Sequence, residues 1–158
     1  MQNPLKHYTL SSASGFYILE HKKKPIGLIA LDASPSHSAP KASKLKADTT
    51  AETAIIRHFF VEEAYRVAGV QADLLEFAVS RAFAANSLSR LRRVRVVSSD
   101  LESYKADTLR AAKFHPVSNW DGTEPQEWKV GVYGWRSRWV EVTREEWAKR
   151  GDKNARQS

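Results

Sequence analysis

Hydrophobic and polar positions divide the first part of the chain into apolar runs with polar segments between them. The runs at 16–20, 26–32 and 54–61 are short and rich in aromatic and β-branched residues, which predicts three strands. Residues 21–25, His-Lys-Lys-Lys-Pro, predict a turn, so the first two strands should form a hairpin. Residues 33–52 consist largely of Ala, Ser, Pro, Lys and Thr and predict a flexible insertion loop.

After Gly69 the apolar positions change to the spacing of a helix. They predict a helix over about 70–85, a strand over 91–97 and a second helix over 101–112. A strand, a helix and a strand in this order favour a parallel crossover, whereas the earlier hairpin is antiparallel. The pattern therefore predicts a mixed α/β sheet.

The last part of the chain combines loop signals with aromatic strands. Residues 114–127 contain two prolines and an Asp-Gly pair and predict mostly loop, and 128–142 predict one or two strands. Residues 143–146, Thr-Arg-Glu-Glu, match a capping box, which predicts a short helix over 144–150. The polar residues 151–158 predict a disordered tail.

Length and composition limit what this protein can be. The 158 residues suit a single domain, which we place over 1–150. The absence of cysteine excludes a disulfide scaffold and a cysteine nucleophile, and the histidines lack metal-ligand spacing. No apolar run reaches the roughly 20 residues of a membrane-spanning helix. The net charge of +7 is compatible with nucleic acid, a membrane surface or a polyanionic small molecule as the partner.

One segment has the local pattern of an anion site. A strand ends at Val61, a connection carries Arg66 and Gly69, and a helix then begins with unpaired amides. Such a helix start suits a phosphate or pyrophosphate, and a glycine lets the backbone approach it closely. On the local pattern alone, an ordinary loop residue before a helix is the favoured explanation of Gly69.

The same segment resembles the GNAT acetyltransferases, in which a strand is followed by an acetyl-CoA signature and a helix. The matching residues are Val61-Glu-Glu-Ala-Tyr65-Arg66, then Val67-Ala-Gly-Val-Gln-Ala72, then Leu74-Leu75. Upstream runs resemble the family's central hairpin, and Leu109-Arg-Ala-Ala-Lys113-Phe114 occupies the place of its "Y-x-x-x-G-F" ending. The resemblance covers about residues 15–118. It implies a GNAT-like mixed, mainly antiparallel sheet flanked by helices, with the N-terminal elements reduced.

The resemblance implies acetyl-CoA as the cofactor, with no metal. Arg66 would lie near the phosphates, and the pantetheine would run near Phe60 and Val61. The pyrophosphate would be held by the backbone amides of Val67, Ala68, Gly69, Val70, Gln71 and Ala72.

Acetyl transfer also implies an acceptor, an amine-bearing small molecule or protein, and a base that deprotonates it. His58 is the candidate base, because imidazole titrates near neutrality. The alternative is that His58 is a strand histidine bonded to a neighbour. Glu62 and Glu63 could act through water, although solvated surface roles explain them as well.

Three residues depart from the family pattern. Gln71 replaces the second small residue of the signature, Leu109 replaces the tyrosine that serves as general acid, and Lys113 replaces a glycine. Tyr104 lies five residues before Leu109 and is a poor substitute for that tyrosine. These departures support an alternative function, a catalytically degenerate GNAT-fold binding or chaperone module of a membrane-anchored protein.

The start of the chain resembles the point at which membrane-tethered, camello-type GNAT proteins leave their apolar hairpin. This implies the soluble part of a protein anchored to the endoplasmic reticulum or another endomembrane; otherwise the protein is cytoplasmic. The basic run Arg90, Arg92, Arg93 and Arg95 predicts a solvated strand face that could also contact anionic lipid head groups.

Aromatic residues are dense near the C-terminus. We interpret them as a core or interface strand, with a homodimer through this tryptophan-rich strand as one outcome. A nucleobase-stacking platform is a third functional hypothesis, but no nucleic-acid-binding motif accompanies it. The residues concerned are Trp128, Tyr133, Trp135, Trp139 and Trp147.

Overall fold

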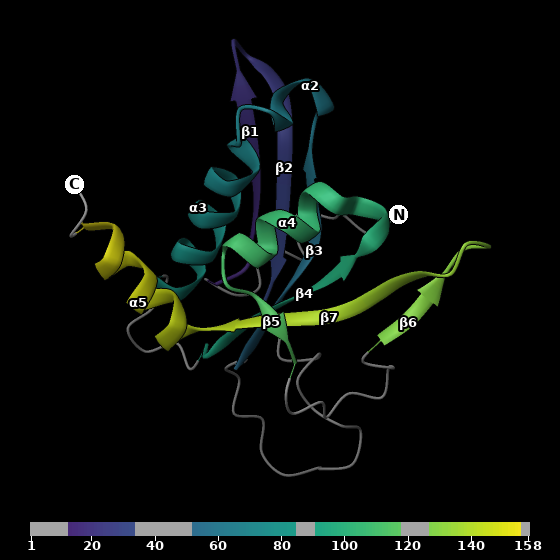
Figure 1. Cartoon of the computed structure of the whole chain (residues 1–158). Helices are drawn as coiled ribbons and strands as arrows, with labels where there is room; N and C mark the ends of the chain where they lie inside the picture. Colours follow the sequence, from purple (N-terminus) through teal and green to yellow (C-terminus); the bar gives the residue numbers. More distant parts are fainter. Residues whose placement is uncertain (1–12, 34–51, 85–90, 118–126, 156–158) are drawn as a thin grey trace, which may run out of the picture.

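The computed structural model describes residues 13–33, 52–84, 91–117 and 127–155 (Figure 1). Their elements, in chain order, are β1 (Gly15–His21), β2 (Lys24–Asp32), β3 (Thr53–Val61), α2 (Glu63–Arg66), α3 (Val70–Ala84), β4 (Arg93–Ser99), the 3-10 helix η2 (Asp100–Glu102), α4 (Ser103–Ala111), β5 (His115–Pro116), β6 (Glu127–Val130), β7 (Trp135–Thr143) and α5 (Arg144–Ala155).

The seven strands form one mixed sheet in the order β1-β2-β3-β4-β7-β5, with β6 paired to β7 alone. Only the β3–β4 pair is parallel, and every other pair is antiparallel. Helices α3 and α4 lie on the same face of the sheet (Figure 1). The predicted fold class, a mainly antiparallel mixed sheet flanked by helices, is confirmed.

Helix α3 forms because its apolar side chains recur on one face, and that face covers β1, β2 and β3. Leu75, Ala78 and Val79 of this helix are almost fully buried against Ile29 and Leu31 of β2. Burying side chains of this size contributes about 1.5–3 kcal/mol each, so this packing fixes where the helix begins relative to the sheet. The start of α3 is thereby held beside the end of β3.

Several predicted boundaries need correction. The segment 62–68, predicted as a plain connection, contains the four-residue helix α2, which is too short to show a periodic pattern. The segment 114–127, predicted as mostly loop, contributes the two-residue strand β5 beside β7. Helix α5 continues to Ala155 instead of ending at 150. The prediction of one or two strands over 128–142 agrees with the structure, which has two strands joined by a turn. The loop predicted over 33–52 lies almost wholly outside the described residues.

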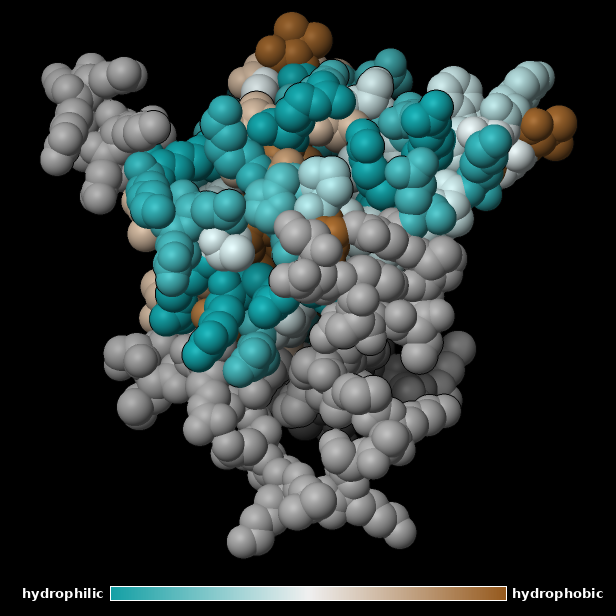
Figure 2. Space-filling view, turned by 60° about the horizontal axis from the view of Figure 1, so that its bottom comes forward, coloured by the Kyte–Doolittle hydropathy of each residue, from teal (hydrophilic) through white to brown (hydrophobic). Residues whose placement is uncertain are grey.

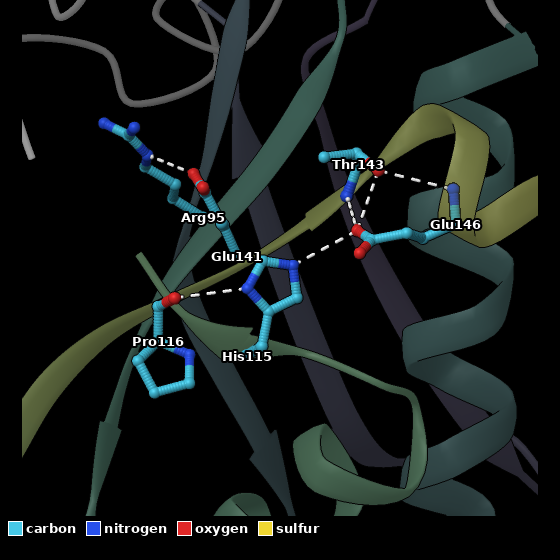
Figure 3. Close-up of polar contacts among 6 residues, drawn as sticks. All are labelled: Arg95, His115, Pro116, Glu141, Thr143 and Glu146. Carbon is cyan, nitrogen blue, oxygen red and sulfur yellow. Dashed lines mark hydrogen bonds and ion pairs between the residues drawn. The ribbon is translucent and has the colours of Figure 1, made fainter. Parts of the chain in front are cut away.

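The predicted solvated face of the arginine run is also corrected. Val94 and Val96 are buried as the alternation requires, and Arg93 and Arg95 lie on the opposite face. Arg95 is not solvated, however, because its Nε donates to Glu141 Oε2 at 2.8 Å and its side chain is 11% exposed. Glu141, on β7, is buried and gains from this ion pair the partner that a buried carboxylate requires (Figure 3).

Next to this pair, His115 of β5 connects the sheet to helix α5 (Figure 3). Its Nδ1 lies 3.1 Å from the Pro116 carbonyl oxygen and its Nε2 lies 3.2 Å from Glu146 Oε2. The Pro116 carbonyl oxygen and the Glu146 carboxylate oxygen are both acceptors. Both contacts are therefore hydrogen bonds only when each ring nitrogen of His115 carries a proton. Glu146 also accepts from the Thr143 amide and hydroxyl, which completes the predicted capping box.

The second residue after helix α4 is a lysine in a backbone conformation that suits glycine. Lys113 has φ of 66°, and the Phe114 amide donates back to the Leu109 carbonyl at 2.9 Å, as in a Schellman cap. A side chain in this left-handed region costs about 1–2 kcal/mol relative to glycine. This backbone conformation explains why the pattern of the resembled family has glycine at this position.

We expect Lys113→Gly to raise the free energy of unfolding by about 1 kcal/mol, because the strain removed exceeds the added entropy of the unfolded chain. Urea unfolding measures this change. The matched control is Ala111→Gly, two residues earlier in the exposed last turn of α4, which should lower stability by about 1 kcal/mol. Destabilisation by both glycines would contradict the assignment of strain to Lys113.

The contacts of His115 predict a pH-dependent stability. Burial lowers the pKa of His115, but the Pro116 carbonyl and the Glu146 carboxylate outweigh it and raise that pKa above 6.5. Burial raises the pKa of Glu146, but hydrogen bonds from Thr143 and His115 outweigh it and lower that pKa below 4.5. The His115 contribution is therefore complete below its unfolded-state pKa and is lost as the pH rises through the folded-state value. The Glu146 contribution is lost as the pH falls through its lowered pKa.

The measurement is urea unfolding of the wild type and His115→Asn across the pH range. The stability difference should be largest at about pH 5–6, where histidine is protonated and glutamate is ionised, and should shrink above about pH 7. A difference that stays constant with pH would show that protonation of His115 contributes nothing.

Candidate functional site

The two parallel strands β3 and β4 separate halfway along β3. Thr53 to Ile56 pair with Arg93 to Val96, and from Arg57 onward none of the described strands pairs with β3 on that side. The backbone groups of β3 that face the gap thus have no neighbouring strand among the described residues, and such an edge can pair with an extended ligand. The separation makes an opening in the middle of the sheet.

A β-bulge marks the point where the strands separate. Across β2 and β3, Ala30 pairs with His58 and Leu31 with Ile56, so Arg57 is the extra residue that the bulge inserts into β3. A bulge bends its strand and increases the local twist, which directs the rest of β3 away from β4. Arg57 lies 3.6 Å from the fully buried Asp32 carboxylate of β2, and this ion pair holds the bulge in place.

The opening is a cleft of about 280 Å³. Its apolar walls come from β3, β4, β7 and α4, and Arg57, Glu102 and Lys105 supply the charge. Glu102 and Lys105 are paired with each other, and Arg57 with Asp32. The apolar lining residues are Ile55, Ile56, Phe59, Val96, Val97, Leu109 and Trp139. The cleft thus combines apolar walls with charged groups, and small-molecule sites contain both kinds of contact.

Beyond the cleft, the chain turns from the end of β3 into the start of α3. Gly69 has φ of 75°, and a methyl group added there would meet no atom within 4 Å. The amides of Ala68, Gly69 and Ala72 donate to carbonyls within this turn. Those of Val70 and Gln71 have no acceptor among the described residues. The start of α3 thus offers two unpaired amides beside an open glycine, the arrangement that suits an anion.

Arg66 ties this turn to the opposite wall of the opening. Its Nε donates to the Val61 carbonyl oxygen at 2.9 Å, and its guanidinium lies 3.9 Å from the ring centre of Tyr104 in α4. The family resemblance implies that Arg66 lies near phosphates. It does not predict the contact with Tyr104, because this residue lies far away along the chain. Arg66 therefore bridges the end of β3 and α4 where β4 no longer joins them.

Gln71, the predicted departure from the signature, makes a local contact. Its Nε2 donates to the Arg66 carbonyl oxygen at 3.1 Å, at the C-terminal end of α2. Its Oε1 is buried and has no hydrogen-bond partner among the described residues. The side chain is engaged with the backbone of α2, and its own amide remains unpaired.

The remaining predicted residues lie in different places. His58 is exposed on β3, on the sheet face opposite α3 and α4, and has no hydrogen-bond partner among the described residues. It does not line the cleft, although it follows the bulge directly. Leu109 is 2% exposed and lines the cleft, so no hydroxyl is present at that point. Phe60 is half-exposed and Val61 is buried at the end of β3.

Two kinds of site have no counterpart in the part of the chain that the structure describes. No group of three or more His, Cys, Asp or Glu side chains is arranged to hold a metal ion there. None of the helices there is long and apolar enough to cross a membrane.

A mixed sheet that opens between two parallel strands, with a helix start beyond the opening, defines a class of α/β proteins with a small-molecule cleft. The acetyltransferase (GNAT) family model matches residues 1–106, so the chain belongs to the GNAT acetyltransferase family. A comparison with curated protein sequences gave no match.

Solved structures of GNAT proteins have the same fold. The GNAT acetyltransferase from Streptococcus pneumoniae has a TM-score of 0.63 at 14% identity, over 88% of this chain and 71% of that one. The spermidine/spermine N-acetyltransferase SpeG from Vibrio cholerae has 0.61 at 14% identity, over 92% and 75%. Ard1 from Thermoplasma volcanium has 0.55 at 15% identity, over 81% and 69%. At these identities the likeness establishes the fold.

We expect Arg66→Lys to lower the free energy of unfolding by about 1–2 kcal/mol, although the charge is kept. Lysine cannot place a planar group on Tyr104 while donating to the Val61 carbonyl. Chemical denaturation measures this loss. Arg81→Lys, on the exposed face of α3, is the matched control and should change stability by less than about 0.5 kcal/mol. Equal stability of the two variants would show that the Arg66 bridge contributes nothing.

Proposed function

We propose that this domain binds acetyl-CoA in the cleft between β3 and β4 and transfers the acetyl group to an amine. The observation that carries the proposal is the separation of the two strands beside a helix start with unpaired amides. Membership of the GNAT family supports acetyl-CoA as the ligand of this cleft. When bound, acetyl-CoA supplies a thioester whose carbonyl carbon an amine can attack.

The residues present suit the two ends of such a ligand. The Val70 and Gln71 amides and the open side of Gly69 would receive the pyrophosphate, at the positive end of the 15-residue helix α3. The unpaired edge of β3, up to Phe60 and Val61, would bind the amide groups of the pantetheine, as an added strand would.

The amides of Val67, Ala68 and Ala72 complete the predicted turn. Those of Ala68 and Ala72 already donate to the backbone, so they would hold its shape instead of binding the anion directly. Arg66 would contribute positive charge near the phosphates while keeping its bridge to Tyr104.

The acceptor would approach from the sheet face opposite α3 and α4, where His58 lies just after the bulge. There His58 would remove a proton from the attacking amine. Its ring nitrogens are accessible for this role, because no described side chain forms a hydrogen bond with them. The acceptor is an amine-bearing small molecule or protein. A polyamine is a candidate to test, because SpeG, a protein of the same fold, acetylates spermidine and spermine by its name.

Leu109 supports a second candidate function, binding of acetyl-CoA without acetyl transfer. Because this buried side chain replaces a hydroxyl at the cleft, the leaving thiolate would have no proton donor at that point. A domain that binds acetyl-CoA without turnover is therefore the second candidate, and the experiment below separates the two. Attachment to an endomembrane stays a prediction.

We expect acetyl-CoA to bind the domain and raise its melting temperature by roughly 5–10 °C at a hundredfold excess over Kd. Gly69→Ala should weaken binding at least about tenfold, since the added methyl group would stand in the open space beside Gly69, where we place the pyrophosphate. Calorimetric titration measures the affinity. Thiol release in the presence of spermidine, spermine or peptide amines measures transfer.

Gly131→Ala is the matched control for backbone strain. Gly131 has nearly the same φ of 71° but lies in the β6–β7 turn, so its replacement should leave acetyl-CoA affinity unchanged. Absence of binding at millimolar acetyl-CoA would overturn the proposal. Binding without thiol release for any amine would leave the cofactor site standing and favour the second candidate.

A further inference from the structure

The β6–β7 hairpin projects from the sheet (Figure 1). Its strands pair Glu127 with Arg138 through Val130 with Trp135. They are joined by a four-residue turn in which the Gly134 amide donates to the Gly131 carbonyl at 3.1 Å. Both glycines have positive φ. They are the first and last residues of the turn, and Val132 and Tyr133 occupy its two corner positions.

The two corner residues are unusual for a tight turn, where small polar residues predominate. Val132 is 100% exposed and Tyr133 is 88% exposed. The cross-strand pair behind them, Val130 and Trp135, is also exposed, and cross-strand partners share a face. The end of the hairpin therefore carries four exposed apolar or aromatic side chains. Figure 2 shows hydrophobic colour at the end of the arm that projects on the right.

Positive charge lies one step behind this apolar end. Lys129 and Arg136 pair with each other across the strands, on the face opposite Val130 and Trp135. Both side chains are exposed, and the structure gives neither an acidic partner among the described residues. The hairpin is thus amphipathic, with an apolar end and two cations about 7 Å behind the turn, at roughly 3.3 Å per residue.

We propose that the end of the β6–β7 hairpin inserts into the headgroup region of an anionic lipid bilayer. This surface is independent of the cleft and of acetyl transfer. Val132, Tyr133 and Trp135 would enter the interface, where tyrosine and tryptophan are favoured. Lys129 and Arg136 would meet the anionic head groups, because surface-bound amphipathic segments bury their apolar side by about 5–10 Å.

The shape of the hairpin favours a lipid surface over a protein partner. Its apolar side chains point outward from a convex end, so a protein partner would need a matching pocket. A fluid interface adapts to a convex end. The net charge of +7 adds long-range attraction to the same anionic surface. This contact needs no spanning helix.

The test is flotation of the whole chain with vesicles of phosphatidylcholine alone and of phosphatidylcholine mixed with phosphatidylserine. We expect binding to the mixed vesicles, weakening as salt rises. The double variant Val132→Ser/Tyr133→Ser should abolish it without loss of folding, because both side chains are solvent-exposed. Lys129→Glu/Arg136→Glu should weaken binding about 30-fold, because the loss of each cation weakens it about fivefold.

Two control variants match these changes elsewhere on the surface. Val67→Ser/Leu101→Ser removes two exposed apolar side chains, and Lys22→Glu/Lys23→Glu makes the same charge change in the β1–β2 turn. The first control should bind as the wild type does. The second should lose only the long-range attraction of its two charges, which is a smaller loss than the hairpin reversal causes. Circular dichroism checks that every variant is folded.

The proposal is overturned if the wild type does not float with the mixed vesicles, or if the tip variant floats as well as the wild type. It is also overturned if the control charge reversal weakens binding as much as the hairpin reversal. Light scattering that shows a dimer lost in the tip variant, without vesicle binding, would assign the surface to a second copy. Salt-dependent oligonucleotide binding lost in the same variant would assign it to nucleic acid.

Discussion

The separation of β3 from β4 is the constraint on which the candidate site depends. A parallel pair that continued past Ile56 would satisfy its backbone groups and leave no opening. The bulge at Arg57 prevents this continuation, and the ion pair to Asp32 stabilises the bulge. Because Asp32 is fully buried, removing the arginine would take away one source of compensation for a buried carboxylate. The ion pair thus supports the backbone conformation that makes the opening.

An open sheet also needs its two sides held at a fixed distance. Helix α3 packs on β1, β2 and β3, and α4 contacts β4, so each helix belongs to one side of the opening. Arg66 joins the sides through the Val61 carbonyl and the Tyr104 ring. The turn with the unpaired amides therefore lies between two anchored elements, which fits a site built for an extended anionic ligand. Preorganisation of this kind reduces the entropy lost on binding.

Much of this arrangement was predictable from the sequence, because hydrophobic period and turn residues are local signals. The strands, the crossover helix and the turn at Gly69 follow from them. The bulge at Arg57, the partner of Arg95 and the Arg66–Tyr104 contact depend on residues far apart along the chain, which one sequence does not bring together. The hairpin tip shows a different limit. Its aromatic pattern predicted a core or interface strand, and the structure buries Trp139 but leaves Trp135 exposed.

We infer that the open edge of β3 and the start of α3 bind one extended ligand, acetyl-CoA. Hydrogen–deuterium exchange with and without acetyl-CoA is the test, since exchange reports hydrogen bonding of each amide. The ligand should slow exchange over 57–61 and at Val70 and Gln71 and leave the β6–β7 hairpin unchanged. Unchanged exchange over 57–61 and at the start of α3, at a saturating concentration, would contradict it.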